Sequence, residues 1–180
     1  MTENRSYLQK YAMHFGTYMG AYWILKFILL PLMFAIPFFQ LLYVILTLSV
    51  PIIGYYYAKT YRDKVCGGVI QFSHAVLFTI FMYMFASLLV AVAHYIYFQF
   101  IDHGFIFNAL ADQAIERSPA LQENKELMKD MFDADKINSL SAIDITMQIL
   151  SLDVFFGSIL AIPTGLMVMK KAKPGNNEPS

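Results

Sequence analysis

Four long apolar stretches constrain this chain of 180 residues more than any other feature. A helix needs roughly 20 mainly apolar residues to cross about 30 Å of hydrocarbon. Within lipid the backbone must satisfy its own hydrogen bonds, which a helix does inside a single segment. The sequence therefore predicts an all-α, polytopic membrane protein with four transmembrane helices, at approximately 13–32, 38–58, 72–101 and 142–169.

The composition favours the same class of protein. Hydrophobic residues make up 58% of the chain and charged residues only 14%, whereas a soluble domain carries about a quarter charged residues. No segment is basic enough to indicate nucleic-acid binding. We expect a single transmembrane domain over residues 1–173, followed by a disordered polar tail at 174–180.

The Lys and Arg residues orient the four spans. Eight of the 13 lie on one side if the chain crosses a membrane four times: Arg5, Lys10, Lys59, Arg62, Lys64, Lys170, Lys171 and Lys173. The segment 102–144, on the opposite side, has nine acids against four bases. Because cytoplasmic loops attract Lys and Arg, both termini are predicted to be cytoplasmic and residues 102–141 to lie outside.

The outside segment has a helical pattern of its own. Apolar residues recur at helical spacing over 107–115, and again over 121–132 after Ser118-Pro119. We therefore expect two short amphipathic helices here. Ser141, with Asp144 three residues on, resembles a capping box that opens the fourth span.

Prolines mark the first hairpin and the second span. Pro31 and Pro37 are expected to bracket the turn at 33–37, because neither can donate a helical backbone hydrogen bond. Pro51 is expected to kink the second span, which neighbouring helices tolerate in a membrane.

Small residues form two stripes at four-residue spacing. Small side chains let helix backbones approach closely in a membrane. The stripes either face each other, joining the first and last spans, or each packs on a different neighbour. They consist of Ala12, Gly16 and Gly20 in the first span, and of Gly157, Ala161 and Gly165 in the fourth.

Lys26 and Asp153 are the charged residues inside the spans, apart from Asp144 at the very start of the fourth span. A charge at the centre of a membrane helix costs roughly 2.5 to 3.5 kcal/mol and normally faces a partner or a cavity. With His94 and Gln40 they form a candidate polar site, for an ion, a proton or an anionic ligand. The structural alternatives are that Lys26 snorkels to the headgroups, that Asp153 lies at the interface, or that the two pair and align helices.

Patterns for catalysis and metal binding are missing from the sequence. His14, His74, His94 and His103 give no HExxH pattern, and the acidic residues at 130–138 depart from the order of an EF-hand loop. The chain has no P-loop or dinucleotide fingerprint. The sequence thus predicts a non-enzymatic protein without a cofactor or metal. Its single cysteine, Cys66, excludes an intramolecular disulfide.

The connection between the second and third spans carries a distinctive set of residues. It combines basic side chains with Gly67-Gly68, which permit the turn into the third span. This pattern and the four-span layout resemble a bacterial membrane family catalogued as domain of unknown function 4199. The resemblance implies this architecture in a bacterial inner membrane, with 102–141 periplasmic, and brings no established activity. The matching residues are Tyr61, Arg62, Asp63, Gly67, Gly68 and Phe72.

Two functions follow from these patterns. The first is a non-enzymatic accessory or scaffold component of the envelope, whose partners are the lipid bilayer and either a membrane protein or a second copy. Arg62 and Asp63 then pair to organise the loop, or else dock a partner or lipid headgroups. The alternative is a small transporter or channel subunit that uses Lys26, Asp153 and His94, although four spans are few for a transporter.

Overall fold

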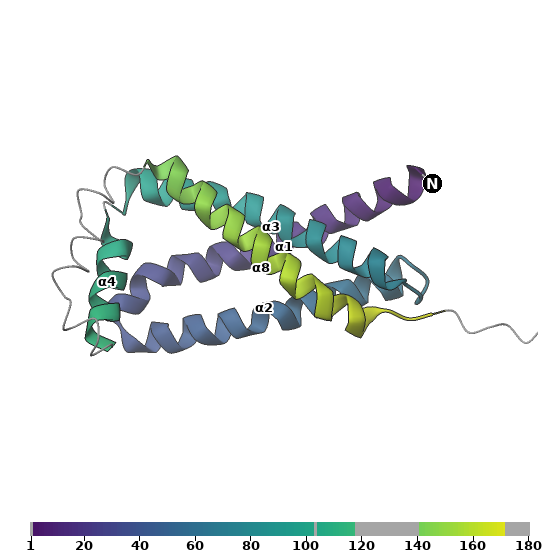
Figure 1. Cartoon of the computed structure of the whole chain (residues 1–180), viewed down its shortest axis with the longest axis horizontal. Coiled ribbons are helices and arrows are strands. Elements are labelled where there is room, and N and C mark those ends of the chain that lie inside the picture. The colour runs from purple at the N-terminus through teal and green to yellow at the C-terminus, as the bar shows by residue number, and fades with distance from the viewer. Residues whose placement is uncertain (1, 103, 118–140, 172–180) are drawn as a thin grey trace, which may run out of the picture. The chain divides into compact units, whose positions relative to one another are not determined.

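The computed structural model describes residues 2–102, 104–117 and 141–171, and the described chain is mainly helical. Four of its helices are long and apolar enough to cross a membrane, which confirms the predicted fold class. Figure 1 shows these four as long continuous helices and α4 as a short one. The helices are α1 (Thr2–Ala35), α2 (Pro37–Lys64), α3 (Phe72–Phe100), α4 (Phe105–Arg117) and α8 (Ala142–Val168).

Two of the long helices extend beyond the predicted apolar spans. Helix α1 begins at Thr2 and α2 continues through the charged residues to Lys64. An apolar stretch marks only the part of a helix suited to lipid, and the backbone ladder continues into polar ends. The bounds of α3 and α8 agree with the predicted spans to within one residue.

The first hairpin is tighter than the sequence indicated. Helix α1 continues through Pro31 to Ala35, so the expectation that Pro31 bounds the turn is wrong. One proline removes a single N–H donor, a loss that helices in membranes tolerate. Only Ile36 separates α1 from α2, and Pro37 starts α2, where its missing N–H is not needed. Pro51 lies inside α2 as expected.

Side-chain caps begin the two later helices. The Ile106 N–H donates to the Asp102 carboxylate at 3.1 Å, which caps α4 and confirms the first predicted amphipathic helix. At α8, the Asp144 N–H donates to Ser141 Oγ and the Ser141 N–H donates to Asp144, both at 3.3 Å. The predicted capping box is therefore confirmed. The second amphipathic helix and the tail at 174–180 lie outside the described residues.

The chain divides into two compact units, and each long helix contributes residues to both. Unit 1 comprises Met1–Gly20, Leu48–Ser87 and Asp153–Ser180, and unit 2 comprises Ala21–Thr47 and Leu88–Leu152. The single transmembrane domain expected over residues 1–173 stays a prediction.

Unit 1 has a core that combines aromatic and small residues. Tyr61, Phe78 and Tyr83 are almost fully buried, and so are Ala12 and Met19. The Tyr61 and Phe78 rings stack at a centroid distance of 4.0 Å with an interplanar angle of 4°. This stack joins α2 to α3, and it bears on the candidate site because Tyr61 belongs to the loop pattern singled out above.

Unit 2 is held by aromatic contacts and by one side-chain bond between helices. The ring of Phe27 on α1 lies 4.3 Å from the ring of His94 and 5.2 Å from that of Tyr97, both on α3. The Tyr22 hydroxyl donates to the Leu46 carbonyl of α2 at 2.9 Å.

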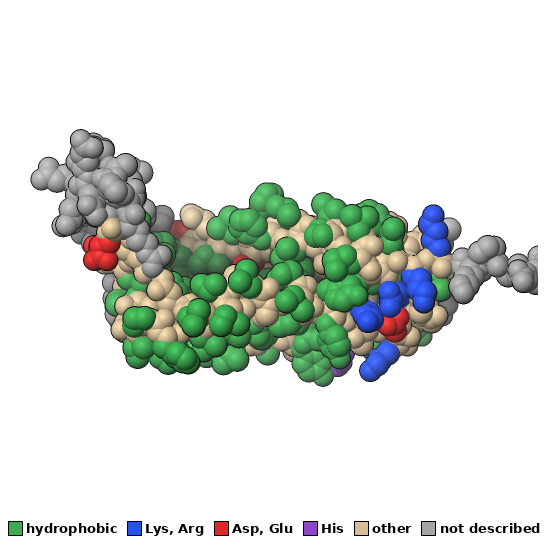
Figure 2. All heavy atoms as spheres, turned by 90° about the horizontal axis from the view of Figure 1, so that it is seen from below, with side chains coloured by type: hydrophobic (Ala, Val, Ile, Leu, Met, Phe, Trp, Pro, Cys, Tyr) green, Lys and Arg blue, Asp and Glu red, His purple; other side chains and the backbone are tan. Residues whose placement is uncertain are grey.

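Large apolar side chains cover the outside of the described helices. Ile52 and Phe100 are each 68% exposed and Met167 is 65% exposed. Figure 2 shows hydrophobic side chains spread over the face in view. Such a surface is a liability in water, whereas hydrocarbon solvates it at no cost. The surface therefore agrees with the span lengths in indicating a multi-pass membrane protein.

Candidate functional site

A polar region with several hydrogen bonds surrounds the connection between α2 and α3, within unit 1. Arg62 and Asp63, in the last turn of α2, form the expected ion pair, with Arg62 Nε 2.7 Å from Asp63 Oδ1. A second bond joins Arg62 Nη2 to Asp63 Oδ2 at 3.1 Å. The guanidinium and carboxylate thus meet as two parallel hydrogen bonds, the geometry that Arg favours.

Arg62 also reaches the end of another helix. Its Nη1 donates to the Val168 carbonyl at 3.0 Å, and Val168 is the last residue of α8. The last carbonyls of a helix lack partners within the helix, and a cation there also complements the helix dipole. Asp63 therefore orients a guanidinium that caps α8. We call this arrangement the Arg62 clamp.

A short backbone pairing reinforces the clamp. Ile70 and Lys170 exchange two hydrogen bonds, both at 3.0 Å, so the α2–α3 connection is tied to the residues after α8. Gly67 and Gly68 precede this pairing with φ values of 66° and 83°. Only glycine adopts these angles without strain, which explains why the turn carries two glycines. Phe72 then starts α3.

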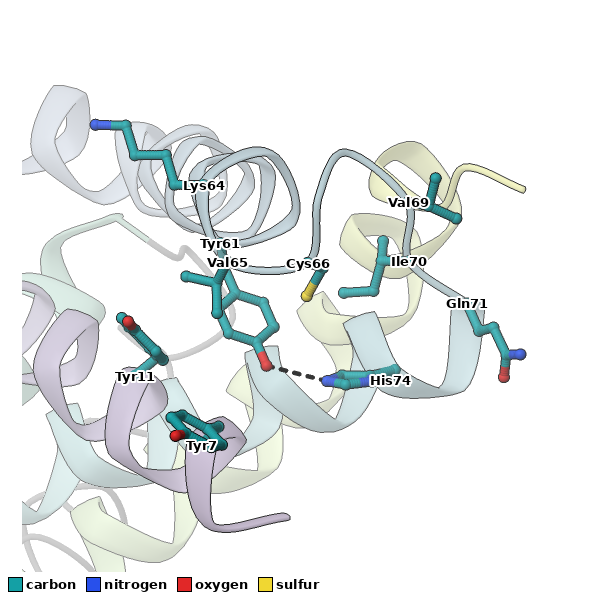
Figure 3. A pocket seen from close by; sticks show the side chains of 10 residues that line it. All are labelled: Tyr7, Tyr11, Tyr61, Lys64, Val65, Cys66, Val69, Ile70, Gln71 and His74. Atoms are coloured by element: carbon teal, nitrogen blue, oxygen red, sulfur yellow. Dashed lines mark hydrogen bonds between the residues drawn. The ribbon is translucent and has the colours of Figure 1, made fainter. Parts of the chain in front are cut away.

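A cavity of about 760 Å³ opens beside this connection. Figure 3 shows Tyr61 from α2, Cys66 from the connection, His74 from α3, and Tyr7 and Tyr11 from α1 around it. The Tyr61 hydroxyl and His74 Nε2 are 3.0 Å apart and hydrogen-bonded. Tyr61 itself is only 2% exposed, and the stack on Phe78 and the bond to His74 position its ring and its hydroxyl.

Basic side chains surround this region. We define the basic cluster as Lys59, Arg62, Lys64, Lys170 and Lys171, from the end of α2 and the residues after α8. Lys59 and Lys170 both act electrostatically on Asp63, so the two segments share one charged neighbourhood. Figure 2 shows Lys and Arg side chains gathered in one part of the face in view. The Asp63 carboxylate beside this cluster is already engaged by Arg62.

Gly16, Gly157 and Gly165 of the two small-residue stripes pack on α3 within unit 1. A Cβ added at Gly16 would lie 2.7 Å from Phe85 Cβ and 2.8 Å from the Met82 carbonyl oxygen. A Cβ added at Gly157 would lie 2.7 Å from Tyr83 Cβ, and one at Gly165 would meet Val76. Both stripes thus place glycines against the same helix, and neither direct pairing nor packing on two different neighbours describes these three glycines. The remaining members, Ala12, Gly20 and Ala161, are buried.

The predicted intramembrane polar residues fall in both units. In unit 2, Lys26 Nζ lies 5.5 Å from the centre of the Tyr43 ring, a cation–π contact between α1 and α2. His94 is 6% exposed, and its Nδ1 has no hydrogen-bond partner among the described residues. Gln40 is half-buried. Asp153 belongs to unit 1, so its pairing with Lys26 stays a prediction.

Several cavity residues escaped the sequence analysis. Tyr7 and Tyr11 are four residues apart and precede the predicted first span, and Cys66 and His74 were given no site role. A signal was present, because Tyr7 and Tyr11 at four-residue spacing share one face of a helix. Nothing in the sequence connected that face to the α2–α3 connection.

These features can be compared with a known family. The family model described as "Protein of unknown function (DUF4199)" matches residues 14–170. The chain belongs to this family. In this DUF4199 member the matched region includes the Arg62 clamp, the α2–α3 connection and both small-residue stripes from Gly16 onward. No curated protein and no solved structure matches the chain.

The environment of Cys66 in this DUF4199 protein predicts a thiol that reacts slowly with alkylating reagents. Burial raises the pKa of Cys66, and the opposing effect of the Tyr61 hydroxyl is smaller. Since the thiolate is the reactive form, a raised pKa leaves less of it at neutral pH. We expect iodoacetamide to modify Cys66 more slowly at pH 7.5 than an exposed cysteine, with the gap closing as the pH rises through the raised pKa.

The matched control for this measurement is Ser73→Cys in a Cys66→Ser background, because Ser73 is exposed and does not line the cavity. Rates are read by mass spectrometry across pH 7 to 10. Equal rates and equal pH profiles for the two cysteines would show that Cys66 is an ordinary exposed thiol.

Proposed function

We propose that this protein is a non-enzymatic accessory or scaffold component of a bacterial inner membrane. Both termini lie in the cytoplasm and residues 102–141 in the periplasm. The topology is supported by the sorting of Lys and Arg around the four spans. Its function is to present a fixed basic surface to an acidic partner in the membrane or at its cytoplasmic face.

The observation that carries this proposal is the Arg62 clamp. It joins the α2–α3 connection to the end of α8 through Arg62, Asp63 and the Val168 carbonyl. Most exposed lysines are mobile, and ordering them on binding costs conformational entropy. Here the backbone that carries Lys59 and Lys170 is held by the clamp and by the Ile70–Lys170 pairing. A pre-ordered set of charges suits docking better than catalysis.

Charge reversal tests the docking surface. Lys59→Glu with Lys170→Glu converts two exposed members of the cluster, and cross-linking in intact membranes followed by purification in mild detergent reports the partner. We expect one cross-linked partner with the unmodified chain and its loss in the double variant. As a matched control, Lys10→Glu changes an exposed lysine outside the cluster and should retain the partner. Cross-linking that is identical in all three proteins would contradict the proposal.

Labelling with a membrane-impermeant thiol reagent tests the topology. In a Cys66→Ser background, a cysteine at Asp130 should react in intact spheroplasts, and one at Ser180 should react only after the membrane is opened. The reverse pattern would overturn the assignment of sides, and with it the cytoplasmic docking surface.

A transporter or channel subunit is a second candidate, supported by His94. A buried imidazole with an unpartnered Nδ1 beside the cationic Lys26 is a costly arrangement that a transported ion or proton would explain. Proteoliposomes with the unmodified chain should then show ion flux that Lys26→Gln abolishes. Flux equal to that of empty liposomes would remove this candidate.

A further inference from the structure

The cavity beside the α2–α3 connection has the size and wall chemistry of a ligand site. Its volume of about 760 Å³ falls within the range of about 300 to 1,000 Å³ that is typical of small-molecule pockets. All of its lining residues belong to unit 1 and come from α1, the end of α2, the α2–α3 connection and the start of α3. Of the basic cluster proposed above as the docking surface, Lys64 alone lines the cavity.

Its polar wall is rich in hydrogen-bond donors. Tyr7 and Tyr11 contribute phenolic hydroxyls, Lys64 an ammonium and His74 an imidazole. When Tyr61 donates to His74 Nε2, the imidazole carries its hydrogen on Nδ1. No Asp or Glu stands among the described residues that line the cavity. A donor-rich wall with one cation and no carboxylate selects an anionic group.

The surrounding charge strengthens this selection. Lys64 belongs to the basic cluster, and the neighbouring Asp63 carboxylate is engaged by Arg62. Figure 3 shows the Lys64 side chain at the rim, with its ammonium turned away from the Tyr61–His74 bond. A lysine at this position is a flexible point charge that can close on an anion after entry.

A second part of the wall is apolar. Val65, Val69 and Ile70 from the connection face the same cavity, and Ile70 is buried. The cavity also lies where α2 ends and α3 begins, next to two helices long and apolar enough to span a membrane. An occupant with an anionic end and an apolar body matches both parts of the wall.

We propose that this cavity binds the phosphate group of an anionic phospholipid. Tyr7, Tyr11 and Lys64 bind the phosphate oxygens, and the glycerol with the start of its acyl chains lies against Val65 and Ile70. A soluble phosphate ester shares the anionic chemistry and lacks the apolar body. The lipid is therefore the favoured source, and the two sources are separated by experiment.

Cys66 provides a probe already in place, because it lines the cavity and is the one cysteine of the chain. The full-length protein is placed in nanodiscs of phosphatidylcholine alone or with 30% phosphatidylglycerol, and the rate of iodoacetamide modification is measured. We expect phosphatidylglycerol to slow modification of Cys66 by about fivefold or more. A negative surface also lowers thiolate levels generally, so Ser73→Cys in a Cys66→Ser background is measured in parallel and should change much less.

Two lysine variants separate the cavity from the basic surface. Lys64→Gln removes the charge at the cavity rim, whereas Lys59→Gln removes another exposed charge of the same cluster that does not line the cavity. A basic residue near an anionic surface contributes about 1 kcal/mol, which corresponds to about fivefold in lipid affinity. Protection should be lost in Lys64→Gln and retained in Lys59→Gln.

Each other outcome overturns the proposal. Equal protection of Cys66 and of the cysteine at position 73 means a surface effect without a site. If protection of Cys66 is lost equally in Lys64→Gln and Lys59→Gln, the basic cluster attracts the lipid and the cavity does not bind it. Protection by millimolar glycerol 3-phosphate in phosphatidylcholine nanodiscs, without protection by phosphatidylglycerol, means a soluble ligand. Nanodiscs expose both faces of the protein, so none of these results depends on the topology or the partner of the proposed function.

Discussion

Gly16→Ala is expected to lower the free energy of unfolding by about 1 to 3 kcal/mol, the usual cost of overpacking a close contact. The added Cβ would lie 2.8 Å from the Met82 carbonyl oxygen and 2.7 Å from Phe85 Cβ. A backbone oxygen cannot rotate away as the end of a side chain can, so α1 and α3 must move apart locally. Unfolding in mixed micelles, followed by far-UV circular dichroism, measures the loss.

The helix propensity of alanine opposes the expected loss of stability, so the sign of the measured change tests the prediction. Replacing glycine by alanine inside a helix normally stabilises it by about 1 kcal/mol, because alanine has the higher helix propensity. The clash must outweigh that gain for the variant to be less stable. Thr17→Ala, at the exposed neighbouring position, serves as the control and should stay within about 0.5 kcal/mol. A stabilised Gly16→Ala protein would mean that α1 and α3 do not approach so closely.

Arg62→Ala is expected to cost about 1.5 to 3 kcal/mol, the range for hydrogen bonds that involve a charged group. The substitution removes the donor to the Val168 carbonyl and leaves Asp63 without its guanidinium. Both losses weaken the contact between the end of α2 and the end of α8. The same unfolding assay measures the change, and limited proteolysis at the α2–α3 connection reports local loosening.

Two further variants identify the reason for the loss. Lys59→Ala removes an exposed basic residue of the same cluster and should change stability by less than about 0.5 kcal/mol. Arg62→Lys keeps the charge but not the planar fork that serves Asp63 and Val168 together, so it should recover only part of the loss. Full recovery by lysine would show that charge alone matters and that the forked geometry is dispensable.

Contacts between residues close in sequence are predictable from the sequence of this protein, whereas contacts between distant segments are not. The capping box of Ser141 and Asp144 was predicted correctly, because it involves residues three apart on one turn. The Arg62–Asp63 ion pair joins sequence neighbours and was also anticipated. Arg62 also bonds to the Val168 carbonyl, which lies 106 residues further along the chain. A backbone carbonyl is present at every residue, so the side chains in the sequence do not mark this one as the acceptor.

The small-residue stripes show the same limit. Their spacing correctly marked the glycines as positions of close helix approach, since a Cβ at Gly16 or Gly157 would lie 2.7 Å from α3. The spacing of the small residues does not specify which helix packs against them, because a face of small residues accepts any helix with a complementary surface. Two stripes on different helices matched each other as well as they matched α3.

The amino-acid sequence by itself determined the class of this protein, since hydrophobic length and the cost of unpaired backbone in lipid leave four helices as the solution. It also determined the two glycines of the α2–α3 turn, because local backbone geometry demands them. Only the tertiary structure decided which helices pack together, what Arg62 caps, and that Tyr7, Tyr11, Cys66 and His74 share a cavity. These are contacts between distant segments, and such contacts depend on shape complementarity across the fold, which no local pattern encodes.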